Sequence, residues 1–91
     1  MPKLERQVTI CNKLGLHARA ATKLAILASD FDASITLIQG DKQASAASVL
    51  GLLMLETGMG KRITIKAEGK DAEAALDAIC ALIDAKFDEA S

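Results

Sequence analysis

The chain contains one histidine, His17, within the stretch NKLGLHARAATKL at residues 12–24. Gly15 lies two residues before it, and Arg19 lies two residues after it. A neutral imidazole is a nucleophile that can carry a covalently bound group. The guanidinium of an arginine keeps its charge and matches the oxygens of a phosphate. These residue types at this spacing favour phosphoryl chemistry at His17.

A helical pattern begins directly after His17, and this position supports the same chemistry. The first backbone N–H groups of a helix have no intrahelical partner, and together with the helix dipole they attract an anion. Gly15 allows a tight turn just before the helix. A lone histidine is more commonly a surface residue or a hydrogen-bonded core residue, and this alternative stays open. We expect no metal site, because no second histidine and no Cys or carboxylate cluster has ligand spacing.

Segments that alternate with period two predict four half-buried strands, and three helical patterns lie between and after them. The strands are expected at 4–10, 33–38, 42–46 and 63–68, with QGD (39–41) as a hairpin turn. In the first strand, Leu4, Val8 and Ile10 share the inward face. The inward positions of the first helix are Ala21, Leu24, Ala25, Leu27, Ala28 and Phe31. A second helix is expected from Ser48 to Leu55. The third is expected to begin at an N-cap, Asp71, and to bury Ala72, Leu76, Ile79, Cys80, Ile83 and Phe87 on one stripe.

The predicted order is therefore β-α-β-β-α-β-α. Every strand has one polar face, so we expect the helices to cover the other face of an antiparallel sheet. The fold class is α+β, an open-faced β-sandwich in which a four-stranded antiparallel sheet carries three helices on one face. A length of 91 residues predicts one domain, residues 1–91.

Composition excludes several classes of function. The net charge is −1 and aromatic residues make up 2% of the chain, which disfavours nucleic-acid binding. No apolar run is long enough to span a bilayer, and the charged amino terminus is not a signal peptide, so we expect a cytoplasmic protein without a membrane partner. Cys11 and Cys80 have no CxxC spacing and are interpreted as reduced apolar residues.

The segment VLGLLML, residues 49–55, has more apolar side chains than one face of a short helix can bury. If Leu52 and Leu55 point inward, some of the others must be exposed. Exposed apolar patches mark docking surfaces, and methionine adapts to several partners. A helix buried on all sides, or a strand, is the alternative interpretation.

Several motifs resemble those of the HPr family, the histidine phosphocarriers of the bacterial phosphoenolpyruvate phosphotransferase system. KLGLHARAA (13–21) is similar to the family's active-site motif, Gly-(Leu/Met)-His-(Thr/Ala)-Arg-Pro-(Ala/Ser). ASAASVLGLL (44–53) resembles its second signature, around a regulatory serine. NKLGLHAR, LLMLETG and the KFDEA tail are more similar to the nitrogen-related branch. The resemblance covers essentially the whole chain.

The resemblance implies a stoichiometric phosphocarrier rather than an enzyme, without a cofactor. His17 would accept a phosphoryl group on Nδ1 from phosphorylated enzyme I of the nitrogen-related branch and pass it to an enzyme IIA protein of that branch. Arg19 would stabilise the phosphate. The resemblance also implies the strand order 1-4-2-3.

The same resemblance places the second helix beside the histidine, on the surface where both partners dock. This surface would consist of Ala18, Ala20, Thr22, Lys23, Ile26, Val49, Leu50, Leu53 and Met54. Because two partners would use it in turn, we expect transient complexes and a monomeric carrier.

Two further residues matter for the family interpretation. Ala20 stands where the family motif has proline, but alanine is a good helix former and transfer is expected to persist. Ser48 is expected to cap the second helix, and it also matches the family's regulatory serine. A phosphate there would add negative charge to an apolar docking face.

A different class of protein fits the same element order. Ferredoxin-like regulatory modules bind small ligands at subunit interfaces. In such a module His17 would be incidental and VLGLLML would form a dimer face.

Overall fold

The structure is a computed structural model that describes residues 3–89. Both ends of the predicted 1–91 domain, and the last residue of the KFDEA tail, lie outside the described residues. The elements are β1 (Lys3–Thr9), α1 (Ala18–Ala28), β2 (Ser34–Gln39), β3 (Lys42–Ser45), α2 (Val49–Met54), β4 (Arg62–Glu68) and α3 (Ala72–Asp84), followed by a short 3₁₀ segment (Lys86–Asp88). Within these residues, no helix is both long enough and apolar enough to cross a membrane.

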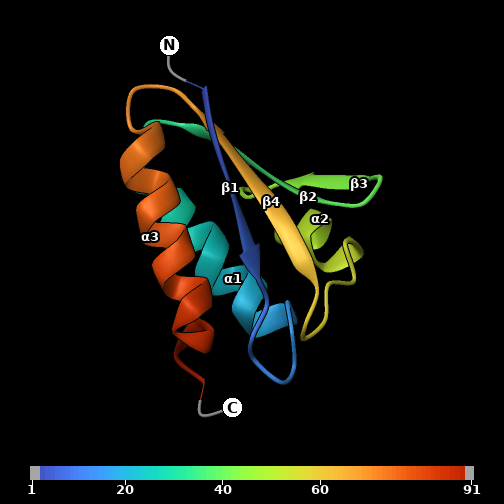
Figure 1. Ribbon diagram of the computed structural model, residues 1–91. Coiled ribbons are helices and arrows are strands. Elements are labelled where there is room, and N and C mark those ends of the chain that lie inside the picture. Colours follow the sequence, from blue (N-terminus) through green and yellow to red (C-terminus); the bar gives the residue numbers. More distant parts are fainter. Residues whose placement is uncertain (1–2, 90–91) are drawn as a thin grey trace.

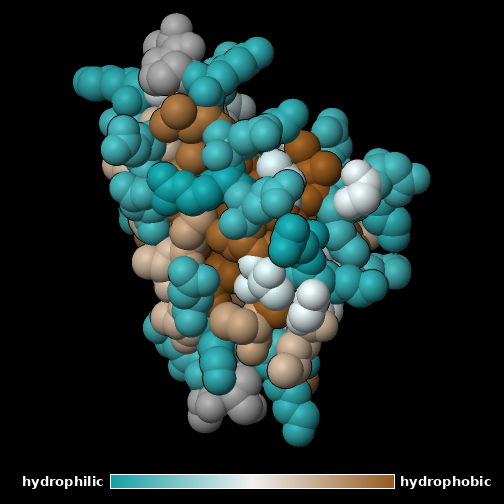
Figure 2. Space-filling view, viewed as in Figure 1, coloured by the Kyte–Doolittle hydropathy of each residue, from teal (hydrophilic) through white to brown (hydrophobic). Residues whose placement is uncertain are grey.

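The four strands form one antiparallel sheet in the order β1-β4-β2-β3. All three helices lie on one side of it, as Figure 1 shows. On the helical side, apolar residues of neighbouring strands stand opposite each other, as in the pair Leu37 and Ile65. On the other side, Figure 2 shows mainly hydrophilic residues over the strands. The predicted open-faced α+β sandwich and its strand order are confirmed.

An almost wholly aliphatic core fills the space between the sheet and the helices. The inward residues of β4, Ile63, Ile65 and Ala67, are buried, as are the predicted inward positions of α3. The first strand differs from its prediction at one end: Leu4 is 37% exposed, because β1 is an edge strand and its start extends past the helices.

The turns and caps follow local chemistry at most positions. Gly40 has a φ of 61° in the two-residue hairpin turn between β2 and β3, where a positive φ is required. Ser48 caps α2, because its Oγ accepts a hydrogen bond from the backbone N–H of Gly51 at 2.9 Å. Asp71 is the N-cap residue of α3, as predicted, but its side chain makes no cap hydrogen bond, because its carboxylate accepts from the backbone N–H of Asp32 at 2.7 Å.

Candidate functional site

His17 is the N-cap residue of α1, with extended backbone angles (φ −82°, ψ −178°). Its side chain makes no cap hydrogen bond, unlike the Ser, Thr, Asp or Asn usually found at this position. The first intrahelical bond is donated by Ala21 to the carbonyl of His17, at 2.8 Å. The N–H groups of Ala18, Arg19 and Ala20 therefore precede the helical ladder and form its positive end.

The turn before His17 depends on Gly15. This glycine has a φ of 67°, and a Cβ there would lie 2.5 Å from the carbonyl oxygen of Thr57. The close approach allows the N–H of Leu16 to donate to that same carbonyl at 2.9 Å. A side chain at position 15 would break this contact and shift the start of α1, so the predicted need for glycine is confirmed.

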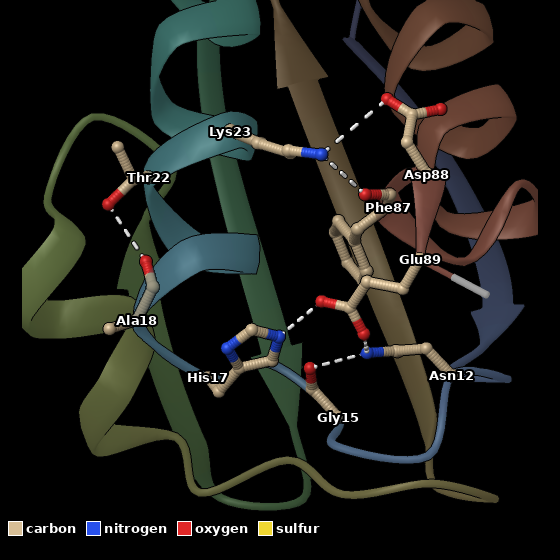
Figure 3. Close-up of polar contacts among 9 residues, drawn as sticks. All are labelled: Asn12, Gly15, His17, Ala18, Thr22, Lys23, Phe87, Asp88 and Glu89. Carbon is tan, nitrogen blue, oxygen red and sulfur yellow. Dashed lines mark hydrogen bonds and ion pairs between the residues drawn. The ribbon is translucent and has the colours of Figure 1, made fainter. Parts of the chain in front are cut away.

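Hydrogen bonds link the side chains of His17, Glu89 and Asn12 in a row, as Figure 3 shows. The carboxylate of Glu89 contacts Nε2 of His17 through one oxygen. Its other oxygen accepts a hydrogen bond from Nδ2 of Asn12 at 2.9 Å. The same Nδ2 donates to the carbonyl of Gly15 at 2.8 Å. Because an ionised carboxylate can only accept, Nε2 carries a proton, and in the neutral imidazole Nδ1 then has a free lone pair. Nδ1 lies on the side of the ring turned away from Glu89.

Positive charge from the amino end of α1 and from Arg19 lies at this end of the molecule together with one carboxylate, that of Glu89. The first turn of α1 contains no acidic residue, so no carboxylate of this helix neutralises the positive end of its dipole. Arg19 is exposed and adds a fixed positive charge. Hydrogen bonds from Asn12 and His17 hold the pKa of Glu89 below its ordinary value, with the charge of Arg19 contributing in the same direction. Glu89 is therefore ionised at neutral pH.

Neither Glu89 nor Asn12 was among the site residues predicted from sequence. After α3, Lys86, Phe87 and Asp88 all have positive φ (59°, 54° and 64°), and this left-handed turn brings Glu89 back over the start of α1. Phe87 is fully buried, as predicted, but from this turn rather than from the stripe of α3. Asn12 is fully buried in the loop after β1, and its position in a turn-forming NKLG sequence is the only local signal for it.

The predicted docking residues divide into exposed, partly buried and buried positions. Ile26, Leu50 and Met54 are 64%, 69% and 67% exposed. Ala18 and Thr22 are also exposed, whereas Val49, Leu53 and Lys23 are partly buried. Ala20 was wrongly assigned to this surface. It is fully buried, because it lies four residues before Leu24 on the stripe of α1 that faces the core.

Two exposed apolar residues near the site were not predicted. Leu14 and Met59 are exposed to a similar extent as the residues of the second helix. Their loops touch at Gly15 and Gly58, and each loop is tied to the other by the Leu16–Thr57 hydrogen bond. Both loops therefore lie next to the turn that precedes His17.

Comparison with known proteins identifies the class. A family model described as the phosphorylation site of the HPr component of the phosphotransferase system (PTS) matches residues 4–85. A phosphocarrier protein NPr from Shewanella violacea is 84% identical over 91 residues, covering all of both chains. The NPr of Escherichia coli K12 is 44% identical over 94% of this chain and 97% of its own. A crystal structure of HPr from Thermoanaerobacter tengcongensis superposes with a TM-score of 0.92 at 36% identity, covering 97% of this chain and 99% of that one.

The chain therefore belongs to the HPr family of phosphocarrier proteins. Its similarity to the two NPr proteins assigns it a phosphocarrier function in the nitrogen-related phosphotransferase system.

Proposed function

We propose that His17 accepts a phosphoryl group on Nδ1 from phosphorylated enzyme I of the nitrogen-related branch and passes it to an enzyme IIA protein of that branch. The protein acts as a stoichiometric, monomeric carrier in the cytoplasm and not as an enzyme, and it requires no cofactor or metal. One observation carries this proposal: the single histidine is the N-cap residue of α1 and leaves the N–H groups of Ala18 and Arg19 uncapped.

The transfer needs few groups from the carrier. The Nδ1 lone pair attacks phosphorus, the bond from phosphorus to the donor breaks, and the donor keeps that electron pair. The phosphoryl oxygens then lie near the first N–H groups of α1, whose dipole favours negative charge. Arg19 supplies a charge that titration does not remove. Ala20 leaves a backbone N–H in this first turn where the family motif has proline, and α1 begins at Ala18 without it.

Both partners use the same docking surface in this proposal. Ile26 on α1 and Leu50 and Met54 on α2 present exposed apolar side chains, and these two helices pack on each other. An apolar surface that is exposed in the free protein is typical of protein interaction sites. Use of one surface by two partners requires that each complex be transient.

Ser48 supplies a second, regulatory proposal. Its hydroxyl is exposed at the start of α2, where it caps the helix. Phosphorylation there by a protein kinase would place nearly two negative charges next to the apolar side chains of Leu50 and its neighbours. This modification would weaken docking without removing the phosphoryl acceptor.

A labelling assay tests the proposed acceptor. The wild-type protein and His17→Ala are incubated with enzyme I and labelled phosphoenolpyruvate, and label should appear only on the wild type. The bond should be labile in acid and stable in base, and adding enzyme IIA should remove the label. Label on His17→Ala, or none on the folded wild type, would contradict the proposal. Dimer formation at micromolar concentration would favour the ferredoxin-like alternative.

A further inference from the structure

Glu89 is the residue of the site for which the carrier function described above leaves no assigned role. It lies outside the helices and strands, yet both of its carboxylate oxygens are engaged by site residues. We propose that Glu89 is a positioning residue for His17, holding the proton on Nε2 so that Nδ1 stays available for phosphorus, and compensating the charge that the ring gains on transfer. This inference rests on His17 being the phosphoryl acceptor.

The hydrogen-bond pattern favours a carboxylate at this position. One oxygen faces Nε2 of His17 and the other faces Nδ2 of Asn12, so both partners are donors. The amide of Asn12 cannot be reversed, because its Nδ2 also donates to the carbonyl of Gly15. A glutamine at position 89 has a single acceptor oxygen and would direct its own NH₂ group at one of the two donors.

The charge change during transfer gives Glu89 a reason to be anionic. When Nδ1 bonds to phosphorus and Nε2 keeps its proton, the ring becomes an imidazolium. No proton has to leave or enter, and the carboxylate of Glu89 remains ionised beside the new positive charge. An acidic side chain that orients an imidazole and stabilises its cation has this role in the Ser-His-Asp triad. When the phosphoryl group passes to the next protein, the bond from Nδ1 to phosphorus breaks and Nδ1 keeps the electron pair. The ring of His17 is then again a neutral imidazole with its proton on Nε2.

The chain around Glu89 is fixed by several contacts. Phe87 is fully buried, and its carbonyl accepts a hydrogen bond from Nζ of Lys23 at 2.8 Å. The same Nζ lies 3.8 Å from Oδ2 of Asp88, but this carboxylate is 69% exposed, so the ion pair adds little to the order of the segment. Lys23 belongs to α1, so the helix that carries His17 at its start also holds the segment that carries Glu89. These contacts order the carboxylate before any partner binds.

Imidazole NMR of the intact protein tests this role without a phosphoryl donor. Because His17 is the only histidine, its ring nitrogens and protons are assigned without ambiguity. At alkaline pH, where a free imidazole is neutral, we expect the wild type to have its proton on Nε2, shifted downfield and protected from exchange. In Glu89→Gln and Glu89→Ala this proton should lose its protection from exchange.

The kinetic arm uses enzyme I and phosphoenolpyruvate, with Asp88→Asn as the matched control. That variant removes a charge from the same segment but not from the ring of His17. We expect phosphorylation of the two Glu89 variants to slow by about tenfold or more, which is the size of effect found when the partner that orients a metal-bound histidine is removed. Asp88→Asn should stay within about twofold of wild type. The amide spectrum confirms that each variant is folded.

The outcomes separate this inference from the carrier function. A protected Nε2 proton and a wild-type rate in both Glu89 variants would overturn the positioning role while leaving His17 as the acceptor. If the wild type shows the protected proton but is never phosphorylated, the carrier proposal fails and the assigned chemical role of Glu89 fails with it. Loss of both the proton and the rate in the Glu89 variants alone would support the inference.

Discussion

The helices α2 and α3 are both rich in apolar residues, but they use them differently. Six residues of α3 are buried, and together they cover β1 and β4. In α2 only Leu52 is buried within the helix, while Leu50 and Met54 are about two-thirds exposed. A domain of this size has limited core, so apolar residues beyond its capacity must face the solvent. Apolar composition therefore indicates stability in α3 and a contact surface in α2.

The largest expected effect is on stability and comes from α3. Ile79 is fully buried in the middle of this helix. Ile79→Ala removes buried methyl groups and leaves a cavity, so it should lower the free energy of unfolding by about 2–5 kcal/mol. Urea unfolding measures this loss, and the phosphorylation rate per folded molecule should stay near the wild-type value. If the phosphorylation rate of Ile79→Ala fell while its free energy of unfolding stayed at the wild-type value, α3 could not be assigned to stability and α2 to partner contact.

The second-largest expected effect is on the rate of phosphoryl exchange, and it comes from α2. Leu50→Asp places a charge on the proposed docking surface, so phosphoryl exchange with both partners should slow by about tenfold or more. The thermal midpoint should remain nearly unchanged, because Leu50 is 69% exposed. Ala74→Asp, on the exposed side of α3, is the matched control and should exchange normally. A large loss of stability in Leu50→Asp would show that this residue belongs to the core.

A smaller effect separates the two proposed roles of Ser48. Ser48→Ala removes the hydrogen bond from the N–H of Gly51 and should cost about 1 kcal/mol of stability, with exchange unchanged. Ser48→Asp keeps a capping oxygen and adds negative charge beside Leu50, so it should slow exchange with little loss of stability. Measurement of both variants by thermal unfolding and exchange kinetics tests this. Equal exchange rates in both would argue against a regulatory role.

The smallest effect concerns the segment that connects α3 to the site. The pKa of Glu89 is lowered in the folded protein by Asn12 and His17. A carboxyl group of this kind stabilises the fold above its unfolded pKa, and this contribution is lost as the pH falls through the folded pKa. The stability difference between wild type and Glu89→Gln should therefore be constant above about pH 5 and decline below about pH 4. Denaturant unfolding over this range measures it, and a difference that increases towards low pH would contradict the hydrogen bonds assigned to the Glu89 carboxylate.

Sequence patterns predicted the elements and their two layers because the strands alternate cleanly and the α3 stripe has helical spacing, whereas the strand order came from the family resemblance. They also placed His17 and Ser48 at helix starts, where local chemistry decides the position. Glu89 could not be predicted in this way. It reaches His17 only through three consecutive left-handed residues, none of them glycine, and such a turn has no composition signal.

Ala20 shows a different kind of error, which the sequence could have prevented. It stands four residues before Leu24 and eight before Ala28, both of which were predicted to face the core. Its place in the docking set came from the family resemblance and not from this spacing. At Asp71 the residue type was right for a cap, but the backbone of Asp32 lies close enough to bind the carboxylate instead.

The most direct test of the carrier function is NMR of the phosphorylated, ¹⁵N-labelled protein. We expect a phosphorus–nitrogen coupling at Nδ1 of His17, with Nε2 still protonated and no other residue modified. An unmodified His17 ring, or phosphorus bonded to another atom of the protein, would contradict the account.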